Sequence, residues 1–512
     1  MRRSVFLCCI TAGFAMKSAA AACAAGLTVM LAEPPRSMDP ADQNATATHS
    51  ILAPFYESLV QQDETGSIRP GLATRWSGSV DGRVWRFTLR PHVLFHDGAP
   101  CDPEAVAASL KRLIDPKAGL AGAGVFRGLI MDVAEDGQDV VITLARPYAD
   151  ILHLLAMTQA AVVSPIAARG GTLGRHADGT GPFRFGDWQD GDHVRALRFD
   201  RYWGAAPSLD WINWTWSPEP SVVNMALQTG DANVVMPISP VFADLYTPGR
   251  PASAEAVVYR APGSALFWAA LNTRLPPLND PRVRRALSLS IDRRALVAGL
   301  LHGNGQPACF AITPETPGAR GCGAAAGADI DQARTLLEQA GWHKGFSITA
   351  VVQEPEEPIA EALQAMWRSI GVRLVIRRQE AGVWVQSAFA PPDEKKRSET
   401  GVIISSWSAP FVADLQIRPL YAAASAAPAG ANLGFYDNPI VDAEIEAAAG
   451  TLDPIGRAAL YGTIQTRLAD DAPMLPLYVQ DDLFGVRRDI EGVTSLPDGE
   501  IVVTQAHRRP VR

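Results

Sequence analysis

Residues 346–407 restrict the fold of this chain more than any other segment, because strand and helix patterns follow one another there without a break. The segment contains, in order, a strand at 346–352, a helix from Pro358 that ends at Gly371, and strands at 372–376 and 401–407. A unit of this kind covers neighbouring strands with helices, and therefore predicts an α/β protein.

The same alternation continues through most of the chain. Strands are predicted at 27–31 and 84–89, and hairpins around Asp136-Gly137 and Asp190-Gly191. Helices are predicted at 103–114, from Asp280-Pro281 through Ala295, and at 330–340. The charged segment 391–399 is expected to be a solvated loop, and the small-residue segment 422–432 another loop.

Composition excludes several classes of protein. The 512 residues are 47% hydrophobic and 20% charged, as in a globular protein rather than a disordered one. The net charge of −8 argues against binding to nucleic acid. No apolar run reaches the length of about 18 residues that a membrane-spanning helix needs.

The first 25 residues have the order of a secretory signal peptide. Arg2 and Arg3 precede an apolar stretch from Val5 to Ala15, and small residues follow up to a cleavage site near Ala25. This predicts export to the periplasm. Lipid anchoring at Cys23 is a less favoured alternative, because Ala20 stands where such a signal carries leucine.

The remaining cysteines and histidines point to no catalytic or metal centre. Cys309 and Cys322 flank a loop rich in proline and glycine, and in an oxidising compartment they are a candidate disulfide; the alternative is two free thiols. His92 and His96 lie in a strand-like context, where residues four apart are about 13 Å from each other, too far to share an ion. No nucleophile elbow or phosphate-binding loop is present, so no catalytic residue and no cofactor is predicted.

Five blocks of sequence resemble the peptide/nickel family of extracellular solute-binding proteins, which serve bacterial ABC importers. They include a Phe-His-Asp-Gly turn, a Gly-Thr-Gly-Pro block that ends in Tyr-Trp-Gly, and an Asn-Thr pair before a capped helix. The blocks stand in the family's order at 72–113, 179–204, 271–291, 331–342 and 470–478. Stretches at 160–165, 225–237 and 407–409 look most like the glutathione-binding members.

The resemblance implies a two-lobed periplasmic-binding-protein fold of type II with an extra inserted domain. It implies that the lobes close on a solute and present it to the permease subunits. The expected division is a signal peptide at 1–25, a first lobe at 26–54, 178–265 and 488–512, an inserted domain at 55–177, and a second lobe at 266–487.

The loop after the 401–407 strand is the first candidate for the ligand site, since ligands of open α/β sheets bind beyond the carboxyl ends of strands. Trp407 and Ser408 are candidates to line it, although Trp407 could instead close the core of the lobe. In dipeptide-binding relatives this loop carries an aspartate that pairs with the peptide ammonium. Pro410 occupies that position here, and Asp414, the nearest acid, is either its substitute or a surface acid.

Other candidates follow from the family pattern. Thr46 and His49 fall on the first-lobe loop that faces the cleft in relatives, and Gln159 is a weaker candidate. Asn272 falls where the family pattern crosses between lobes, and is either a cleft or a hinge residue. Two arginines could anchor a carboxylate in bidentate fashion or lie on the surface: Arg274 and Arg418.

The favoured interpretation is a monomeric periplasmic carrier of a small peptide or peptide-like solute, resembling glutathione. No histidine lies between Trp407 and Tyr436, where nickel-binding relatives carry a metal ligand, so no metal site is predicted. The alternatives are a carrier for an opine, a sugar phosphate or a metallophore, a secreted enzyme on the same scaffold, and a sensor that presents its ligand to a receptor.

Overall fold

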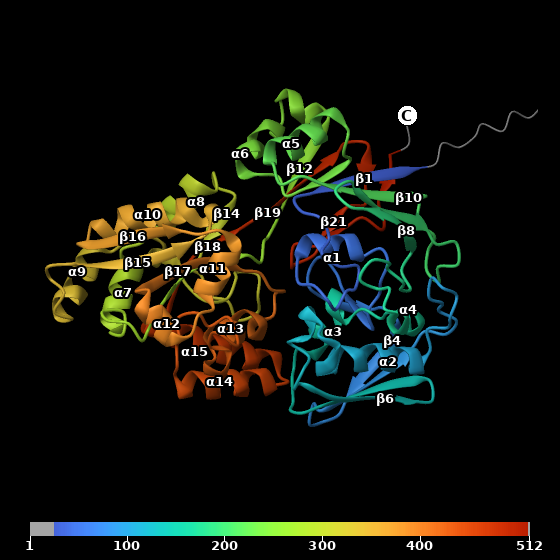
Figure 1. The fold of residues 1–512 in the computed structure, drawn as a ribbon, viewed down its shortest axis with the longest axis horizontal. Coiled ribbons are helices and arrows are strands. Elements are labelled where there is room, and N and C mark those ends of the chain that lie inside the picture. Colours follow the sequence, from blue (N-terminus) through green and yellow to red (C-terminus); the bar gives the residue numbers. More distant parts are fainter. Residues whose placement is uncertain (1–24, 510–512) are drawn as a thin grey trace, which may run out of the picture.

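The computed structural model describes residues 25–509, and the strands of this part form two large sheets, a smaller four-stranded sheet and three two-stranded ones. The predicted signal peptide and Cys23 lie outside the described residues. Among residues 25–509 we find no helix with the length and apolarity needed to span a bilayer. Figure 1 shows the two large sheets on opposite sides of the molecule, with the smaller sheet below the first of them.

The first lobe is built on a seven-stranded sheet whose order is β12–β19–β11–β1–β10–β9–β8. Its strands are β1 (Gly26–Leu31), β8 (Phe183–Gln189), β9 (His193–Arg198), β10 (Trp211–Trp216), β11 (Val234–Met236), β12 (Ala256–Ala261) and β19 (Asp482–Arg487). Leu27, Val29 and Leu31 alternate into a core that also contains residues of α1 (Thr46–Leu52), and the opposite face is covered by α5 (Pro220–Thr229) and α6 (Pro240–Ala243).

The second lobe is built on a six-stranded sheet whose order is β14–β18–β13–β17–β15–β16. Its strands are β13 (Leu266–Leu271), β14 (Gly305–Pro307), β15 (Phe346–Val352), β16 (Val372–Arg378), β17 (Thr400–Trp407) and β18 (Met474–Gln480). Alternate residues of β13 enter two different cores, because successive side chains of a strand point to opposite faces.

Helices therefore cover both faces of the second-lobe sheet. One face packs on α7 (Pro281–Leu289), α8 (Arg293–Leu300), α9 (Ile330–Gln339) and α10 (Glu357–Arg368). The other face packs on α11 (Ala381–Ala388), α13 (Ala413–Tyr421), α14 (Pro439–Gly450) and α15 (Pro454–Asp471). The predicted unit 346–407 lies at the centre of this lobe, with β15 and β16 parallel as expected.

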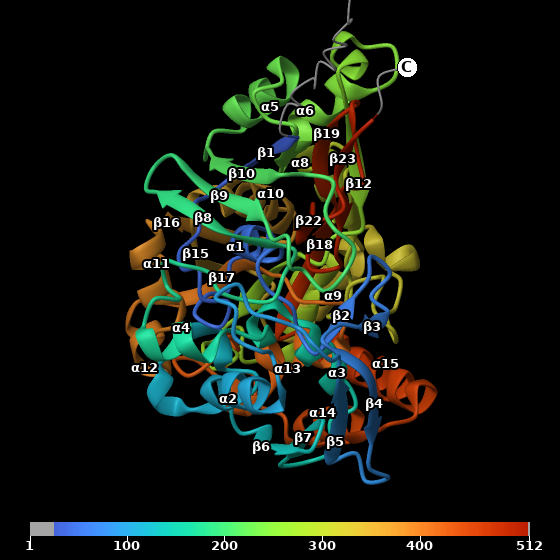
Figure 2. The same ribbon diagram turned by 90° about the vertical axis from the view of Figure 1, so that its right-hand side faces the viewer.

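The smaller, inserted sheet has the order β4–β5–β7–β6 and packs on α2 (Pro103–Ile114) and α3 (Ile151–Ala156). Its strands are β4 (Ala73–Gly78), β5 (Val84–Leu89), β6 (Ile130–Asp136) and β7 (Asp139–Leu144). Outside these three sheets lie the short α4 (Pro165–Gly170) and the hairpins β2–β3 (Val60–Gln62, Ile68–Pro70) and β21–β22 (Thr494–Ser495, Ile501–Val502). The strands β20 (Ile490–Glu491) and β23 (His507–Arg508) pair with each other on either side of the second hairpin in sequence. Figure 2 shows the inserted sheet at one end of the molecule.

Three sequence predictions differ from the structure. The single helix expected to reach Ala295 is two helices, because Asp292 caps α8 through a bond from the Ala295 amide to its carboxyl (3.0 Å). β19 already belongs to the first lobe at Asp482, so the chain leaves the second lobe before residue 487.

The third difference concerns the charged segment 391–399, which contains α12 (Pro392–Arg397) rather than a solvated loop. Lys395 is fully buried there. Its Nζ donates to the Leu433 carbonyl (2.8 Å) and lies 4.6 Å from the centre of the Phe435 ring. A long aliphatic stem lets a lysine pass through apolar surroundings and reach such partners, which a charge count does not reveal.

Candidate functional site

Two neighbouring segments connect the first lobe to the second. One leaves β12 after Ala261 and enters β13 at Leu266, and the other leaves β18 after Gln480 and enters β19 at Asp482. The two segments run antiparallel: Ala261 pairs with Asp482, and the Gln480 amide donates to the Ala265 carbonyl (3.3 Å). We call this crossing between the lobes the hinge, and the candidate site lies beside it.

Trp407 and Ser408 lie on the second-lobe side of the hinge. Trp407 ends β17 opposite Leu266, and its Nε1 donates to the Leu415 carbonyl (3.0 Å). The half-buried indole packs on both the second-lobe core and the core of the inserted sheet. Ser408 is exposed and its hydroxyl lies 2.7 Å from that of Ser264 in the hinge. Both residues are therefore close to the junction between lobes.

Asp414 is neither a surface acid nor free to meet a ligand in this structure. Its side chain is 2% exposed, and both carboxylate oxygens accept from Arg418 Nε (3.0 and 2.9 Å). Tyr148, next to the inserted sheet, donates its hydroxyl to Asp414 Oδ2 (2.9 Å), and Tyr461 donates to Oδ1 (3.3 Å). We call these four residues the Asp414 network. It joins the second lobe to the part of the chain that carries the inserted sheet.

Further contacts extend this interface. The Ala149 amide donates to the Ala449 carbonyl (2.8 Å). Two ion pairs also cross it: Arg146 with Glu446 (3.0 Å) and Arg457 with Asp150 (3.4 Å). A pocket of about 180 Å³ lies in the interface. It is lined by Gln62, Thr65, Gly66, Asp150, His153, Glu315, Pro317, Phe411, Val412, Ala413, Pro454, Arg457, Ala458 and Tyr461. Because ligand pockets usually measure about 300–1,000 Å³, this one holds at most part of a solute.

On the first-lobe side, α1 brings two of the predicted residues toward the hinge. Thr46 begins this helix and is half-buried, whereas His49 is 7% exposed. Gln159 is buried nearby, and its Nε2 lies 3.5 Å from Asn44 Oδ1 while its Oε1 has no partner within residues 25–509. Thr46, His49 and Gln159 thus lie in one region of the fold, the last of them within the expected insertion 55–177.

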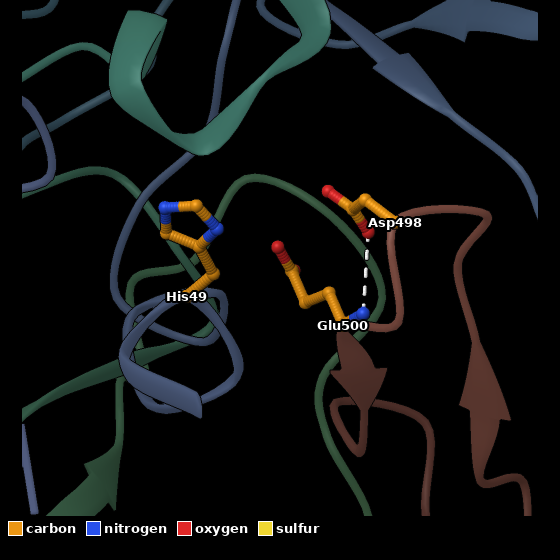
Figure 3. A group of neighbouring side chains, drawn as sticks. All are labelled: His49, Asp498 and Glu500. Atoms are coloured by element: carbon orange, nitrogen blue, oxygen red, sulfur yellow. Dashed lines mark hydrogen bonds between the residues drawn. The ribbon is translucent and has the colours of Figure 1, made fainter. Parts of the chain in front are cut away.

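The structure adds two acids that the sequence prediction missed. Asp498 and Glu500 stand on the turn between β21 and β22, and Figure 3 shows their carboxyl groups beside the His49 ring. One ligand-type atom from each of the three residues lies within 4.8 Å of the others. We call these three residues the buried acid cluster. His49 precedes the two acids by 449 and 451 positions in the sequence, and no local pattern connects it to them.

Burial dominates the electrostatics of this cluster. It raises the pKa of Glu500 to about 8 and also raises that of Asp498, because a buried charge is poorly solvated. The same effect lowers the pKa of His49 to about 4. Asp482 in the hinge has its pKa raised to about 7 by burial and by the nearby acids Asp498 and Asp481.

Asn272 and Arg274 lie elsewhere. Asn272 follows β13, whose register pairs Leu266 with Trp407 and Leu271 with Val402, so it stands at the opposite end of the sheet from Trp407. The buried Asn272 amide donates to the Thr400 carbonyl (3.1 Å), and the exposed Arg274 lies 5.6 Å from the Phe435 ring. A strand of six residues spans about 20 Å, which separates this pair from the hinge.

The structure joins the last predicted pair, Cys309 and Cys322, in a disulfide with a Cα–Cα distance of 5.3 Å. It closes the loop that follows β14 and lies apart from the groups at the hinge.

Two α/β lobes joined by paired crossing segments, with buried polar groups on the first-lobe side of the hinge, define a two-lobed solute-binding protein. The chain belongs to the bacterial extracellular solute-binding proteins of family 5, because the profile of that family's middle region matches residues 67–426. The fold class inferred from the sequence, type II with an inserted domain, is confirmed.

Relatives and solved structures agree with this assignment. The glutathione-binding protein GsiB of Salmonella typhimurium is 30% identical over 471 residues, which are 90% of each chain. The binding protein DppA of Helicobacter pylori, solved with the peptide STSA, is 24% identical with a TM-score of 0.79, over 95% of this chain and 98% of its own. A dipeptide-binding protein of Pseudoalteromonas, solved with Met-Leu, is 23% identical with a TM-score of 0.81, over 94% and 100% of the two chains.

Proposed function

We propose that this protein captures a small peptide or peptide-like solute, resembling glutathione, between its two lobes and delivers it to the permease of an ABC importer. The observation that carries the proposal is the similarity to a glutathione-binding protein over 90% of both chains. It is supported by the position of the polar groups beside the hinge, where closure of the lobes would enclose a solute.

The site residues of this proposal come from both lobes. Trp407 and Ser408 supply an aromatic face and a hydroxyl from the second lobe, while Thr46, His49 and Gln159 stand on the first-lobe side. Arg418 and Asp414 are assigned to holding the interface, since each already has the other as its partner. Asn272 and Arg274 are assigned no contact with the solute.

The proposed cellular setting follows from the same family. The protein acts as a monomer in the periplasm after removal of residues 1–25, and its partners are the permease subunits. The proposed division keeps the first lobe, the insertion at 55–177 and the second lobe from 266, with the second lobe ending before Asp482.

The experiment is a direct search for the solute. Protein purified from the periplasm is analysed by native mass spectrometry, and the bound molecule is released by denaturation and identified. The refolded protein is then titrated calorimetrically with reduced glutathione, Met-Leu and an opine. We expect an intact peptide or thiol tripeptide to be released, and glutathione or the dipeptide to bind.

The alternatives give different results in the same experiment. Release or binding of an opine or another non-peptide solute alone would replace the proposed ligand class. Chemical conversion of the added peptide, monitored by chromatography, would identify an enzyme on this scaffold. Relatives of the chain are binding proteins, which favours recovery of the solute unchanged.

A further inference from the structure

We propose that the buried acid cluster of His49, Asp498 and Glu500 receives the ammonium group of the bound solute. This inference rests on the proposed function, and it assigns a site within it. In dipeptide-binding relatives the resemblance places the ammonium partner on the loop after Trp407, where this chain has Pro410 and where Asp414 is already paired. Asp414 is therefore not free to receive an ammonium group in this structure.

In the described part of the chain, no cation pairs with the carboxyl groups of the cluster. Glu500 is 5% exposed, and its Oε2 accepts from the Thr158 hydroxyl (2.8 Å). Asp498 Oδ1 accepts from the Glu500 amide (3.2 Å). Within residues 25–509 neither carboxyl forms an ion pair with lysine or arginine. A buried acid in such a place is costly unless it is protonated or meets a cation.

His49 provides the independent observation that the cluster receives a ligand. The side chain is 7% exposed, its Nε2 is buried without a partner, and no hydrogen bond to the ring forms within the described chain. Figure 3 shows His49 Nδ1 on the side of the ring that faces Glu500, with Asp498 beyond it, whereas Nε2 lies on the far side of the ring. Buried polar groups are nearly always hydrogen-bonded in folded proteins, so an almost inaccessible ring whose Nδ1 faces two acids, without a partner in residues 25–509, indicates a position for a polar group of a ligand.

The geometry fits an ammonium group. A primary ammonium group has three N–H donors, and the cluster has one acceptor atom from each of three side chains. Acceptors placed tetrahedrally at about 2.8 Å from one nitrogen lie about 4.6 Å apart, and the cluster atoms lie within 4.8 Å of one another. The neutral form of His49, favoured by its lowered pKa, leaves one ring nitrogen as an acceptor.

The cluster is also placed where a solute would reach it. Asp498 is only half-buried, and a Cβ at the neighbouring Gly499 would lie 3.2 Å from Asp482 Oδ2 in the hinge. That Asp482 oxygen is itself buried without a partner within the described residues. In Figure 1, α1 and β21 lie on the side of the first lobe that is nearest the second lobe. Asp482 is thus a third acid near the cluster, and its charged form adds negative potential beside the hinge.

The test compares free and blocked amines on the ligand-free, refolded protein. Glutathione and Met-Leu are titrated calorimetrically beside their N-acetyl derivatives, which keep the rest of the molecule but lack the ammonium. We expect N-acetylation to weaken binding to the wild-type protein at least tenfold. This comparison needs no variant, so it does not depend on whether a substituted cluster folds.

The variants locate the effect. Glu500→Gln and Asp498→Asn remove charge with little change of shape, and each should weaken the free peptides at least tenfold while leaving the weak binding of the N-acetyl forms unchanged. The control is Glu64→Gln, the same change at an exposed acid, which should bind all four peptides like the wild type.

Four results would overturn the inference, the last of them together with the proposed function. Equal binding of free and N-acetyl peptides by the wild type would overturn this inference and leave the proposed function standing. Unchanged binding of the free peptides by both cluster variants would do the same. Binding of Zn²⁺ or Ni²⁺ by the peptide-free protein, lost on His49→Ala and Glu500→Gln, would reassign the cluster to a metal ion. If the wild type bound neither free peptide, the proposed function would fall, and this inference with it.

Discussion

Asp414 and Glu500 are both buried acids near the junction of the lobes, yet their surroundings are opposite. Asp414 meets Arg418 and two tyrosine hydroxyls, so its charge is compensated within the protein. Glu500 meets one threonine hydroxyl and a second acid, Asp498, and burial raises its pKa to about 8. The first arrangement stabilises an interface, whereas the second leaves the carboxyl of Glu500 without a compensating charge from the described residues.

The difference teaches how to separate structural acids from ligand-binding acids. Burial alone does not distinguish them, because both side chains are almost inaccessible. A compensating cation distinguishes the two kinds of acid, because a buried carboxylate without one destabilises the ligand-free fold. The predictions below test this distinction through stability, where the two acids should respond with opposite sign.

The largest effect is expected for Asp414→Ala. Removal of one partner leaves the largely buried Arg418 without its main counter-charge, and losses of about 3–5 kcal/mol are typical when a buried ion pair is broken in this way. The loss is measured by urea unfolding followed by circular dichroism. Asp437→Ala, at an exposed acid of the same lobe, is the matched control. If both variants unfolded at the same urea concentration, the network would have no structural role.

A smaller loss is expected for Tyr148→Phe. This change removes one hydrogen bond to Asp414 and leaves the ion pair with Arg418 in place. A hydrogen bond to a charged group contributes about 1.5–3 kcal/mol, and we expect the lower end of this range. Thermal unfolding provides the measurement, with Tyr259→Phe at an exposed tyrosine as control. A loss equal to that of Asp414→Ala would mean that the hydroxyl, rather than the ion pair, dominates the network.

Glu500→Gln should stabilise the ligand-free protein at alkaline pH. The folded pKa of Glu500 is raised to about 8, against about 4.3 in the unfolded chain. Below about pH 4.3 the carboxyl is protonated in both the folded and the unfolded chain, and the fold has its full stability. As the pH rises toward 8, the unfolded chain releases the proton while the folded chain keeps it, so the free energy of unfolding falls. Glutamine does not ionise and avoids this loss.

The wild type should therefore lose at least about 1 kcal/mol relative to Glu500→Gln between pH 5 and pH 8, a difference that one pKa unit already produces. Urea unfolding at four pH values measures it. Other groups with shifted pKa, such as Asp482 and His49, are present in both proteins and cancel to first order. Parallel pH profiles would show that Glu500 is compensated after all.

The smallest effect is expected for Arg146→Ala. Its partner Glu446 is half exposed, with 51% of its side chain accessible, and Arg146 is 37% exposed. Exposed ion pairs contribute about 0–1 kcal/mol, so the loss should stay below 1 kcal/mol and shrink in 0.5 M salt. Thermal unfolding at two salt concentrations tests this. A loss as large as that of Tyr148→Phe would show that the exposed ion pair contributes as much to the stability of the interface as the buried hydrogen bond.

Much of the local structure could be predicted from the sequence. Asp102 and Pro103 mark the start of α2 correctly, and the alternating run 84–89 coincides with β5. Such signals depend on neighbouring residues only. The same reasoning failed at Lys395, because its burial depends on Leu433 and Phe435, which approach it only in the folded lobe.

The candidate site was less accessible to prediction. Trp407 and His49 were identified, the first by its position at the end of a strand and both by resemblance to a family. Asp414 was identified as well, but its pairing with Tyr148 depends on the contact between the second lobe and the inserted part. Asn272 was expected at the crossing between lobes, and only the strand register places it at the far end of the sheet.

The sequence by itself determined the α/β class, the positions of most helices and strands, and the likeness to a family of two-lobed binding proteins. It did so because helix caps, turns and apolar periodicity act over a few residues. Only the tertiary structure decided that Asp414 is compensated and that Asp498 and Glu500 meet His49 with no cation from the described residues beside them. The physical reason is that the free energy of a buried charge depends on the groups within a few ångströms, and these come from segments hundreds of residues apart.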